Sequence, residues 1–120
     1  MGTPLVIDPQ AIENLRSLSA GDDDEFLREI IGIFLEDTPQ RIAELTQSLQ
    51  AGDVAKFTRA AHSIKGSSAN LGASTLRALA EKLEHQSRQT GLDGAAPLVG
   101  EIQAEFTRAE TELRRLLPPR

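Results

Sequence analysis

The 120-residue chain has no cysteine, tryptophan or tyrosine. Without cysteine it can form neither a disulfide scaffold nor a thiolate metal site, and it has no cysteine nucleophile. Aromatic residues make up only 3%, all of them phenylalanine, so a core must be built from Leu, Ile, Val and Ala. The 39% of hydrophobic and 26% of charged residues are typical of a globular protein. We expect a single domain over residues 1–120.

Basic residues and long apolar runs are also scarce. The 18 acidic side chains outnumber the 13 Lys and Arg, which gives a net charge of −5. Nucleic acids are bound mainly through such cations, so we expect no nucleic-acid partner. No apolar run approaches the roughly 18 residues of a membrane span, and Met-Gly-Thr-Pro at the start lacks the features of a signal peptide. We therefore expect a cytoplasmic protein without direct membrane contact.

The apolar pattern predicts five helices and no strand. The first begins at Asp8, an N-cap before Pro9, and ends at Gly21. An acidic cluster follows at residues 22–25. It is either the start of a helix, where negative charge and a capping side chain are favourable, or a cation site. We favour the helix start, because no glycine and no distal Glu complete a calcium loop.

The second predicted helix runs from this cluster to near Gln50 and contains Pro39. Its apolar stripe keeps its phase across the proline, which predicts one long kinked helix. A break with Thr38 as a new N-cap is the alternative. The stripe consists of Phe26, Ile30, Phe34, Ile42, Leu45 and Leu49, with Leu27, Ile31 and Leu35 beside it.

Three further helices are predicted by apolar residues at steps of three and four. Asp53 caps the third, Ser74 caps the fourth and Gly91 ends it, and two prolines follow the fifth. The inward residues are Val54, Phe57, Ala61, Ile64, Ser68 and Leu71 in the third helix, Leu76, Leu79 and Leu83 in the fourth, and Leu98, Ile102, Phe106, Ala109, Leu113 and Leu116 in the fifth. Short connections make neighbouring helices antiparallel. The sequence thus predicts an all-α fold, an antiparallel up-down-up-down four-helix bundle with a short additional N-terminal helix across one end.

Residues 61–72 break the local rules for a helix. Gly66, Ser67, Ser68 and Asn70 are poor helix formers close to His62, and a glycine inside a helix costs about 1 kcal/mol relative to alanine. Several broken rules in one place are expected at a functional site. We interpret Gly66 as the residue that opens one side of the His62 ring to a partner.

His62 is the candidate nucleophile. It lies about 100° around the helix from the inward Ala61, at the edge of the exposed face. An unperturbed imidazole is mostly neutral near pH 7 and can attack phosphorus. Lys65 can neutralise the product, Arg59 can add to the field, and a serine hydroxyl of Ser67 or Ser68 can donate a hydrogen bond. The alternative is an ordinary surface histidine on a helix that needs small residues for close packing.

The segment A-A-H-S-I-K-G-S-S-A-N-L-G resembles the signature of histidine-containing phosphotransfer (HPt) domains, H-x-x-K-G-S-[SA]-x-x-x-G on the third long helix of a small bundle. The matching residues are His62, Lys65, Gly66, Ser67, Ser68, Asn70, Leu71 and Gly72. The segment F-L-E-D-T-P-Q-R-I is similar to the second helix of that family, the proline included. The resemblance covers the expected core, residues 8–117.

This resemblance implies a phosphorelay carrier. A receiver-domain aspartyl phosphate or a kinase would phosphorylate His62 on Nε2, and the group would pass to a receiver aspartate. Lys65 would hold the phosphate and Gly66 would give access. Some members place a glutamine opposite the histidine. Here the position is Glu84, whose carboxylate could orient the imidazole but would repel a phosphate.

The expected partners are response-regulator receiver domains and a hybrid sensor histidine kinase. A receiver would dock on small, apolar and polar residues around His62, namely Ala55, Thr58, Arg59, Ser63 and Ala69, with Gln40 and Arg41 of the second helix nearby. We expect a monomeric phosphocarrier rather than an enzyme, since no Walker loop or paired-glycine nucleotide lid is present.

We expect neither a metal nor a cofactor. His85 points outward, and Glu81 and Glu84 have the wrong offsets from it for a metal-binding bundle. Two alternatives stay open: the phosphotransfer domain of a chemotaxis-type histidine kinase, whose R-A-A-H-S-I-K-G segment is also similar, and a helical interaction bundle without phosphate chemistry. The sequence leaves open the cognate receiver, the direction of phosphate flow and whether the chain belongs to a larger kinase.

Overall fold

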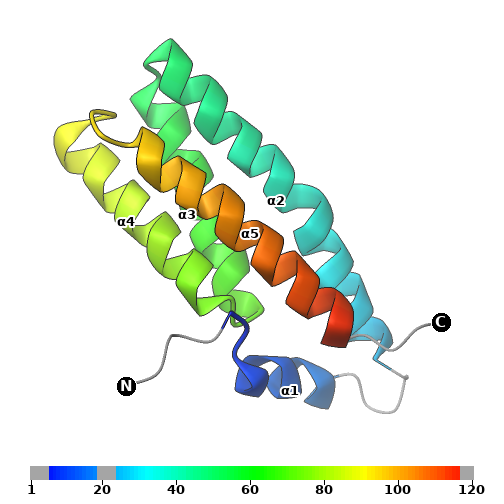
Figure 1. The fold of residues 1–120 in the computed structure, drawn as a ribbon. Helices are drawn as coiled ribbons and strands as arrows, with labels where there is room; N and C mark the ends of the chain where they lie inside the picture. Colours follow the sequence, from blue (N-terminus) through cyan, green and yellow to red (C-terminus); the bar gives the residue numbers. More distant parts are fainter. Residues whose placement is uncertain (1–5, 19–23, 117–120) are drawn as a thin grey trace.

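The computed structural model describes residues 6–18 and 24–116 of the chain. It contains α1 (Pro9–Ser17), α2 (Glu25–Ala51), α3 (Val54–Asn70), α4 (Ser74–Thr90) and α5 (Ala96–Leu116), and every regular element in these ranges is a helix. The four long helices lie side by side along one axis, and α1 crosses one end of them (Figure 1). The predicted all-α antiparallel bundle with a short additional helix is confirmed.

Several predicted helix ends are also confirmed. The Asp8 side chain accepts a hydrogen bond from the backbone N–H two residues on, with Pro9 as the first helical residue. Asp53 caps α3 in the same way through the N–H three residues on, at 3.1 Å. Gly91 ends α4, as predicted, and Gly52 follows α2 in the same way; both have positive φ. Local side-chain chemistry is sufficient to set these boundaries.

The acidic cluster leads into a helix, as predicted, whereas the predicted cap at Ser74 is wrong. Asp24 is the N-cap of α2, but it has a φ of +65° and makes no side-chain cap hydrogen bond. Its carboxylate instead lies 3.4 Å from Nε of Arg16 on α1. Ser74 is the first residue of α4 rather than its cap, because its hydroxyl turns back to the Gly72 carbonyl oxygen at 3.4 Å. Gly21 and the first two residues of the acidic cluster, 22 and 23, lie outside the described residues.

Helix α2 continues through Pro39, so the prediction of one long helix is confirmed and the alternative break at Thr38 is wrong. In its first turns the buried face is shifted by one residue from the predicted stripe, whereas Phe34, Ile42 and Leu45 are buried as predicted. Phe26 and Ile30 are only half-buried, and the buried residues are Leu27, Ile31, Phe34, Thr38, Ile42, Leu45 and Ser48. The pattern offered two adjacent apolar lines, and the packing of α2 against its neighbours selects between them.

The predicted inward residues of α3, α4 and α5 are buried, apart from three near helix ends or edges. Leu79 and Leu116 are partly buried, and Val54 at the first turn of α3 is exposed. Helix α3 packs extensively against α4 on one side and α2 on the other. Phe34 of α2 meets Phe106 of α5 at a ring separation of 5.7 Å. Helix α3 is therefore held from two sides, and only its outer face is free.

Gly72 ties α1 to the bundle. Its carbonyl oxygen accepts a hydrogen bond from the Asp8 N–H at 2.7 Å. Its φ is +70°, and a Cβ atom at this position would lie 2.6 Å from the Cβ of Ala11. The positive φ and the short contact with Ala11 each favour glycine at this position. In residues 6–18 and 24–116, no helix combines the length and apolarity needed to cross a membrane.

Candidate functional site

His62 lies on the outer face of α3, and 64% of its side chain is exposed. Ala55 and Ala69 stand two helical turns before and after it and are also exposed. Residues seven apart share one line along a helix, so these three form a ridge. The predicted position of His62 at the exposed face is confirmed.

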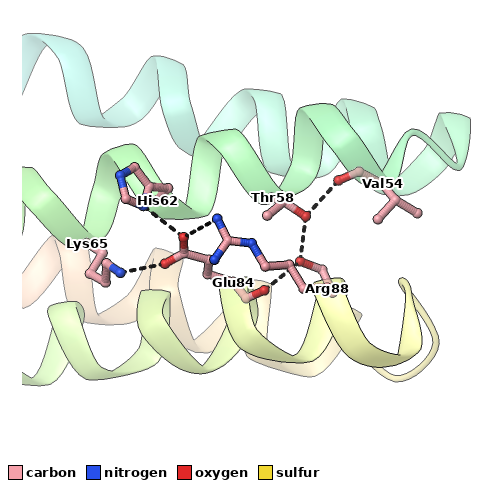
Figure 2. A network of polar contacts seen from close by, with 7 residues as sticks. Val54, Thr58, His62, Lys65, Glu84 and Arg88 are labelled. Atoms are coloured by element: carbon pink, nitrogen blue, oxygen red, sulfur yellow. Dashed lines mark hydrogen bonds and ion pairs between the residues drawn. The ribbon is translucent and has the colours of Figure 1, made fainter.

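A buried carboxylate from α4 holds the inner nitrogen of the ring. Glu84 is only 3% exposed, and its Oε2 lies 2.8 Å from Nδ1 of His62. Lys65 Nζ lies 2.7 Å from Oε1, and the Arg88 guanidinium lies 3.0 Å from Oε2. Figure 2 shows the carboxylate between the ring and the two cations. One carboxylate thus organises a cluster of four side chains across the α3–α4 interface.

The surroundings of Glu84 keep it ionised. Burial by itself raises the pKa of this carboxyl, but hydrogen bonds from Lys65 and His62, together with their charges, lower the pKa, and the net direction is below its usual value. The group is therefore a carboxylate at neutral pH, and it can only accept hydrogen bonds.

This carboxylate selects the tautomer of the neutral His62 ring. Since Glu84 can only accept, the 2.8 Å contact requires that Nδ1 carries the proton and donates it. In a neutral imidazole the other nitrogen, Nε2, then holds the lone pair. The arrangement can therefore present an unprotonated ring nitrogen, as a nucleophile needs.

Gly66 leaves open space beside the histidine. A Cβ atom built there would meet no atom within 4 Å outside its own helix turns. The packing of the bundle therefore does not require a glycine, in contrast to Gly72. The interpretation of Gly66 as an opening for a partner is consistent with this geometry.

We expect Gly66→Ala to raise the free energy of unfolding by about 1 kcal/mol, because the helix gains a better former and the methyl group meets no neighbour. Gly66→Gln should in contrast slow phosphoryl uptake from a receiver at least about tenfold, by placing a long side chain in the opening. Urea unfolding and transfer kinetics measure the two effects. Gly32 of α2 also faces open space, so Gly32→Ala and Gly32→Gln are the matched controls. Normal transfer by Gly66→Gln would show that access does not depend on this glycine.

A groove of about 540 Å³ begins at His62 and runs along α3 and α4. It is lined by Val54, Ala55, Thr58, Arg59, His62, Ser63, Ser87 and Arg88. The hydroxyls of Thr58 and Ser87 lie 2.7 Å apart and join the two helices there (Figure 2). The structure therefore brings four of the predicted docking residues together with the histidine, but Ala69 lies outside the groove.

Other predicted residues lie in separate hollows. Arg41 lines a smaller hollow between α2 and α3 with Arg59 and Ser63, and Gln40 is exposed beside it on α2. Ser67 is half-buried and lines a third hollow with Ile33 and Asn70. Ser68 is fully buried. The hydrogen-bond partner of the His62 ring is Glu84, the residue that the resemblance placed opposite the histidine.

His85 is exposed on α4, as predicted. Within the two described ranges, no group of three His, Asp or Glu side chains is placed to hold a metal ion.

Comparisons with known proteins show the family of the chain. The family model described as "Hpt domain" matches residues 29–112, which include the histidine, both cations and the carboxylate. The chain belongs to the Hpt domain family. Members of this family transfer phosphoryl groups in two-component phosphorelays, together with receiver domains and hybrid kinases.

Among curated relatives of this Hpt domain is multistep phosphorelay regulator 1 of Schizosaccharomyces pombe, 30% identical over 96 residues. That match covers 80% of the chain but only 32% of the fission-yeast protein. Histidine-containing phosphotransfer protein 2 of Arabidopsis thaliana is 22% identical over 111 residues, 90% of this chain and 70% of that protein. The chain thus spans about a third of the first relative and over two thirds of the second.

Solved Hpt structures have the same fold. Histidine-containing phosphotransfer protein B from Pseudomonas aeruginosa superposes with a TM-score of 0.84 at 27% identity, over 94% of this chain and 95% of that one. The maize phosphotransfer protein ZmHP2 superposes with a TM-score of 0.81 at 23% identity, over 92% and 81% of the two chains.

The sequence did not point to Arg88 of this Hpt domain, and it left the role of Glu84 open. Glu84 was placed opposite the histidine only by resemblance, and its hydrogen bond to the ring joins residues 22 apart in the chain. Arg88 stands four residues after Glu84 and pairs with it on the same helix. This spacing is the usual one for an ion pair, so it could have found Arg88 once Glu84 was recognised.

Proposed function

We propose that His62 is the phosphoryl acceptor and donor of this Hpt domain, with Nε2 as the reacting atom. The observation that carries this proposal is the contact of Nδ1 with the ionised Glu84, in a ring that is largely exposed. The Nε2 lone pair attacks the phosphorus of a receiver aspartyl phosphate. The P–O bond breaks, its electron pair returns to the aspartate, and the reverse reaction passes the group on.

Lys65 and Arg88 supply positive charge where the phosphoryl group arrives. Both reach Glu84 within 3.0 Å and therefore stand beside the ring that this carboxylate holds. A dianionic phosphoryl group on Nε2 attracts both, and a charge-assisted contact from either lowers its energy. Arg59 adds a further cation from the wall of the groove. Ser67 supports the phosphate only if its hydroxyl leaves the hollow that it now lines.

The proposal makes the chain a carrier with a covalent phosphohistidine and without a nucleotide site of its own. It acts as a monomer in the cytoplasm, receiving from a hybrid sensor kinase or from a receiver and donating to a receiver. The test is incubation with a phosphorylated receiver, followed by intact-mass measurement and mapping of the label. Label on His62 supports the proposal. Labelling by ATP alone, or no label from a panel of receivers, contradicts it.

We further propose that the receiver docks over the ridge and the groove beside His62. The supporting observations are the exposure of Ala55 and Ala69 on the line of the histidine and the continuity of the groove with the ring. Small side chains let a partner approach closely, and Arg59 and Arg88 at the groove suit an acidic partner.

Arginine at either alanine of the ridge is expected to weaken receiver binding and slow transfer at least about tenfold, since a few central contacts dominate such interfaces. Ala55→Arg and Ala69→Arg are compared with Ala104→Arg, at an exposed alanine on α5. All three should unfold at nearly the same temperature. Transfer kinetics against a cognate receiver measure the effect, and normal rates in both ridge variants would place the interface elsewhere.

A further inference from the structure

The Glu84 carboxylate beside the His62 ring is more than phosphoryl acceptance requires. A neutral amide could also hold Nδ1, because it offers both a donor and an acceptor. Glu84 instead brings a buried negative charge to 2.8 Å from the ring that is to carry a dianion. The charge therefore acts on the phosphorylated state as well as on the free histidine.

Phosphorylation changes what Nδ1 can do. When neutral His62 attacks through Nε2, the ring becomes a cation that has the phosphoryl group on Nε2 and a proton on Nδ1. Loss of that proton would leave a lone pair on Nδ1 facing the Glu84 oxygen, two acceptors at hydrogen-bond distance. The ionised carboxylate therefore favours the protonated ring strongly over the deprotonated one.

We propose that Glu84 keeps the phosphorylated His62 ring protonated and thereby makes its phosphoryl group labile, so that this Hpt domain relays phosphate quickly rather than storing it. This inference rests on the proposed function of His62. Glu84 acts here as a positioning residue, because it touches Nδ1 and not the phosphorus.

The lability follows from the leaving group. In hydrolysis, a water oxygen forms a bond to phosphorus, the P–Nε2 bond breaks, and its electron pair goes to Nε2. A protonated ring then leaves as neutral imidazole with Nδ1–H still donated to Glu84, while the water protons pass to the solvent and the new phosphate. A deprotonated ring would have to leave as an imidazolate anion, which is far less stable. Transfer to an aspartate oxygen follows the same course.

Several other charged groups surround the His62 ring, and the experiment must distinguish their effect from that of Glu84. Helix α3 contributes Lys65 and Arg59, and α4 contributes Arg88 beside Glu84. From α2, Arg41 and Glu44 line the neighbouring hollow and lie 3.3 Å from each other. The cations favour the deprotonated ring. Glu84 is the carboxylate in direct contact with the ring and favours the protonated form. Removal of the Glu84 carboxylate should therefore lower the pH at which the phosphorylated ring loses its proton.

The experiment uses a His85→Gln background, in which His62 is the one histidine left of the two in the chain. In that background, protein with Glu84 is compared with the Glu84→Gln variant. Phosphoramidate phosphorylates the ring without a receiver: its P–N bond breaks, ammonia leaves and the P–Nε2 bond forms. The lifetime of phosphohistidine is then followed by intact mass and ³¹P NMR from acid to alkaline pH. Circular dichroism reports that each variant is folded.

Two controls remove a carboxylate elsewhere. Glu105→Gln loses a buried carboxylate of α5, which pairs with Arg108. Glu81→Gln loses an exposed one on α4, which pairs with Arg77. Neither pairs with His62, so both should leave the lifetime and its pH profile unchanged.

We expect the lability of the wild-type phosphohistidine to persist to a pH at least about one unit higher than in Glu84→Gln, the size of a shift caused by one adjacent opposite charge. Above both midpoints the variant should hold its phosphate about tenfold longer for each unit of difference. If Glu84→Gln acted only by removing the repulsion between the carboxylate and the phosphoryl group, the lifetime of phosphohistidine would lengthen equally at every pH. Coincident midpoints, or a shorter lifetime in Glu84→Gln, would overturn the inference.

The outcome separates this inference from the proposed function. The lifetime is measured on chemically phosphorylated protein, so it does not depend on any receiver. If receivers exchange phosphate with His62 while the two midpoints coincide, the inference fails and the carrier role stands. If the midpoints differ but no receiver exchanges phosphate, the carrier role fails and the effect of Glu84 on the ring stands.

Discussion

The His62→Gln variant is expected to take up no phosphoryl group from any receiver, while its thermal unfolding stays nearly unchanged. Glutamine has no nucleophilic ring nitrogen, so the covalent intermediate cannot form. The side chain is 64% exposed, and exposed polar substitutions usually change stability by less than about 0.5 kcal/mol. Glu84 keeps Lys65 and Arg88 as partners in the variant, so the buried carboxylate is not stranded.

The matched control is His85→Gln, which removes the other exposed histidine, on α4. It should accept phosphate at the wild-type rate, and the label should be acid-labile and base-stable, as a P–N bond is. Mass spectrometry after incubation with a phosphorylated receiver measures both variants. Retained labelling of His62→Gln would show that another residue carries the phosphate.

The Gly72→Ala variant is expected to lose about 3 kcal/mol of stability, the largest effect of any methyl group added to a glycine described here. Two causes add. A φ of +70° is unfavourable for a residue with a Cβ, at a cost of about 1–2 kcal/mol. The new methyl carbon would also lie 2.6 Å from the Cβ of Ala11 and 3.0 Å from Asp8, and overpacking of this kind costs about 1–3 kcal/mol.

Gly52→Ala separates the two causes. Gly52 has nearly the same φ, +71°, but a Cβ there would meet nothing within 4 Å. Its substitution should therefore show the cost of the backbone conformation alone. Urea unfolding of both variants gives the difference, which measures the clash with α1. Equal losses in the two variants would mean that α1 moves away without cost.

The sequence predicted local features better than contacts between helices. Asp8 and Asp53 cap their helices through N–H groups two or three residues away, so the neighbouring residues were sufficient to predict them. Helix α2 was harder, because Phe26 and Leu27 begin two parallel apolar lines. Which of the two lines is buried depends on how α3 and α5 pack against α2. The apolar pattern of one helix does not determine that packing.

In the site, too, contacts within one helix were predictable and contacts between helices were not. His62, Lys65 and Gly66 lie within one turn of α3, and their proximity follows from helical spacing. Glu84 comes from another helix, and whether it touches the ring depends on the rotation of α4 against α3. Asp24 is the N-cap residue of α2, as the predicted helix start allows, but its carboxylate contacts Arg16 of α1, and the local sequence did not predict that contact between helices.

The cluster around Glu84 also gives an acidic protein a local excess of positive charge. The chain carries a net charge of −5, but at this point two cations share one carboxylate. Such a patch attracts an acidic partner from a distance and speeds its encounter. A dianionic phosphoryl group on His62 cancels that excess. The field that guides an acidic phosphodonor toward the empty histidine therefore weakens when the group has been transferred, and the spent partner dissociates more readily from the loaded domain.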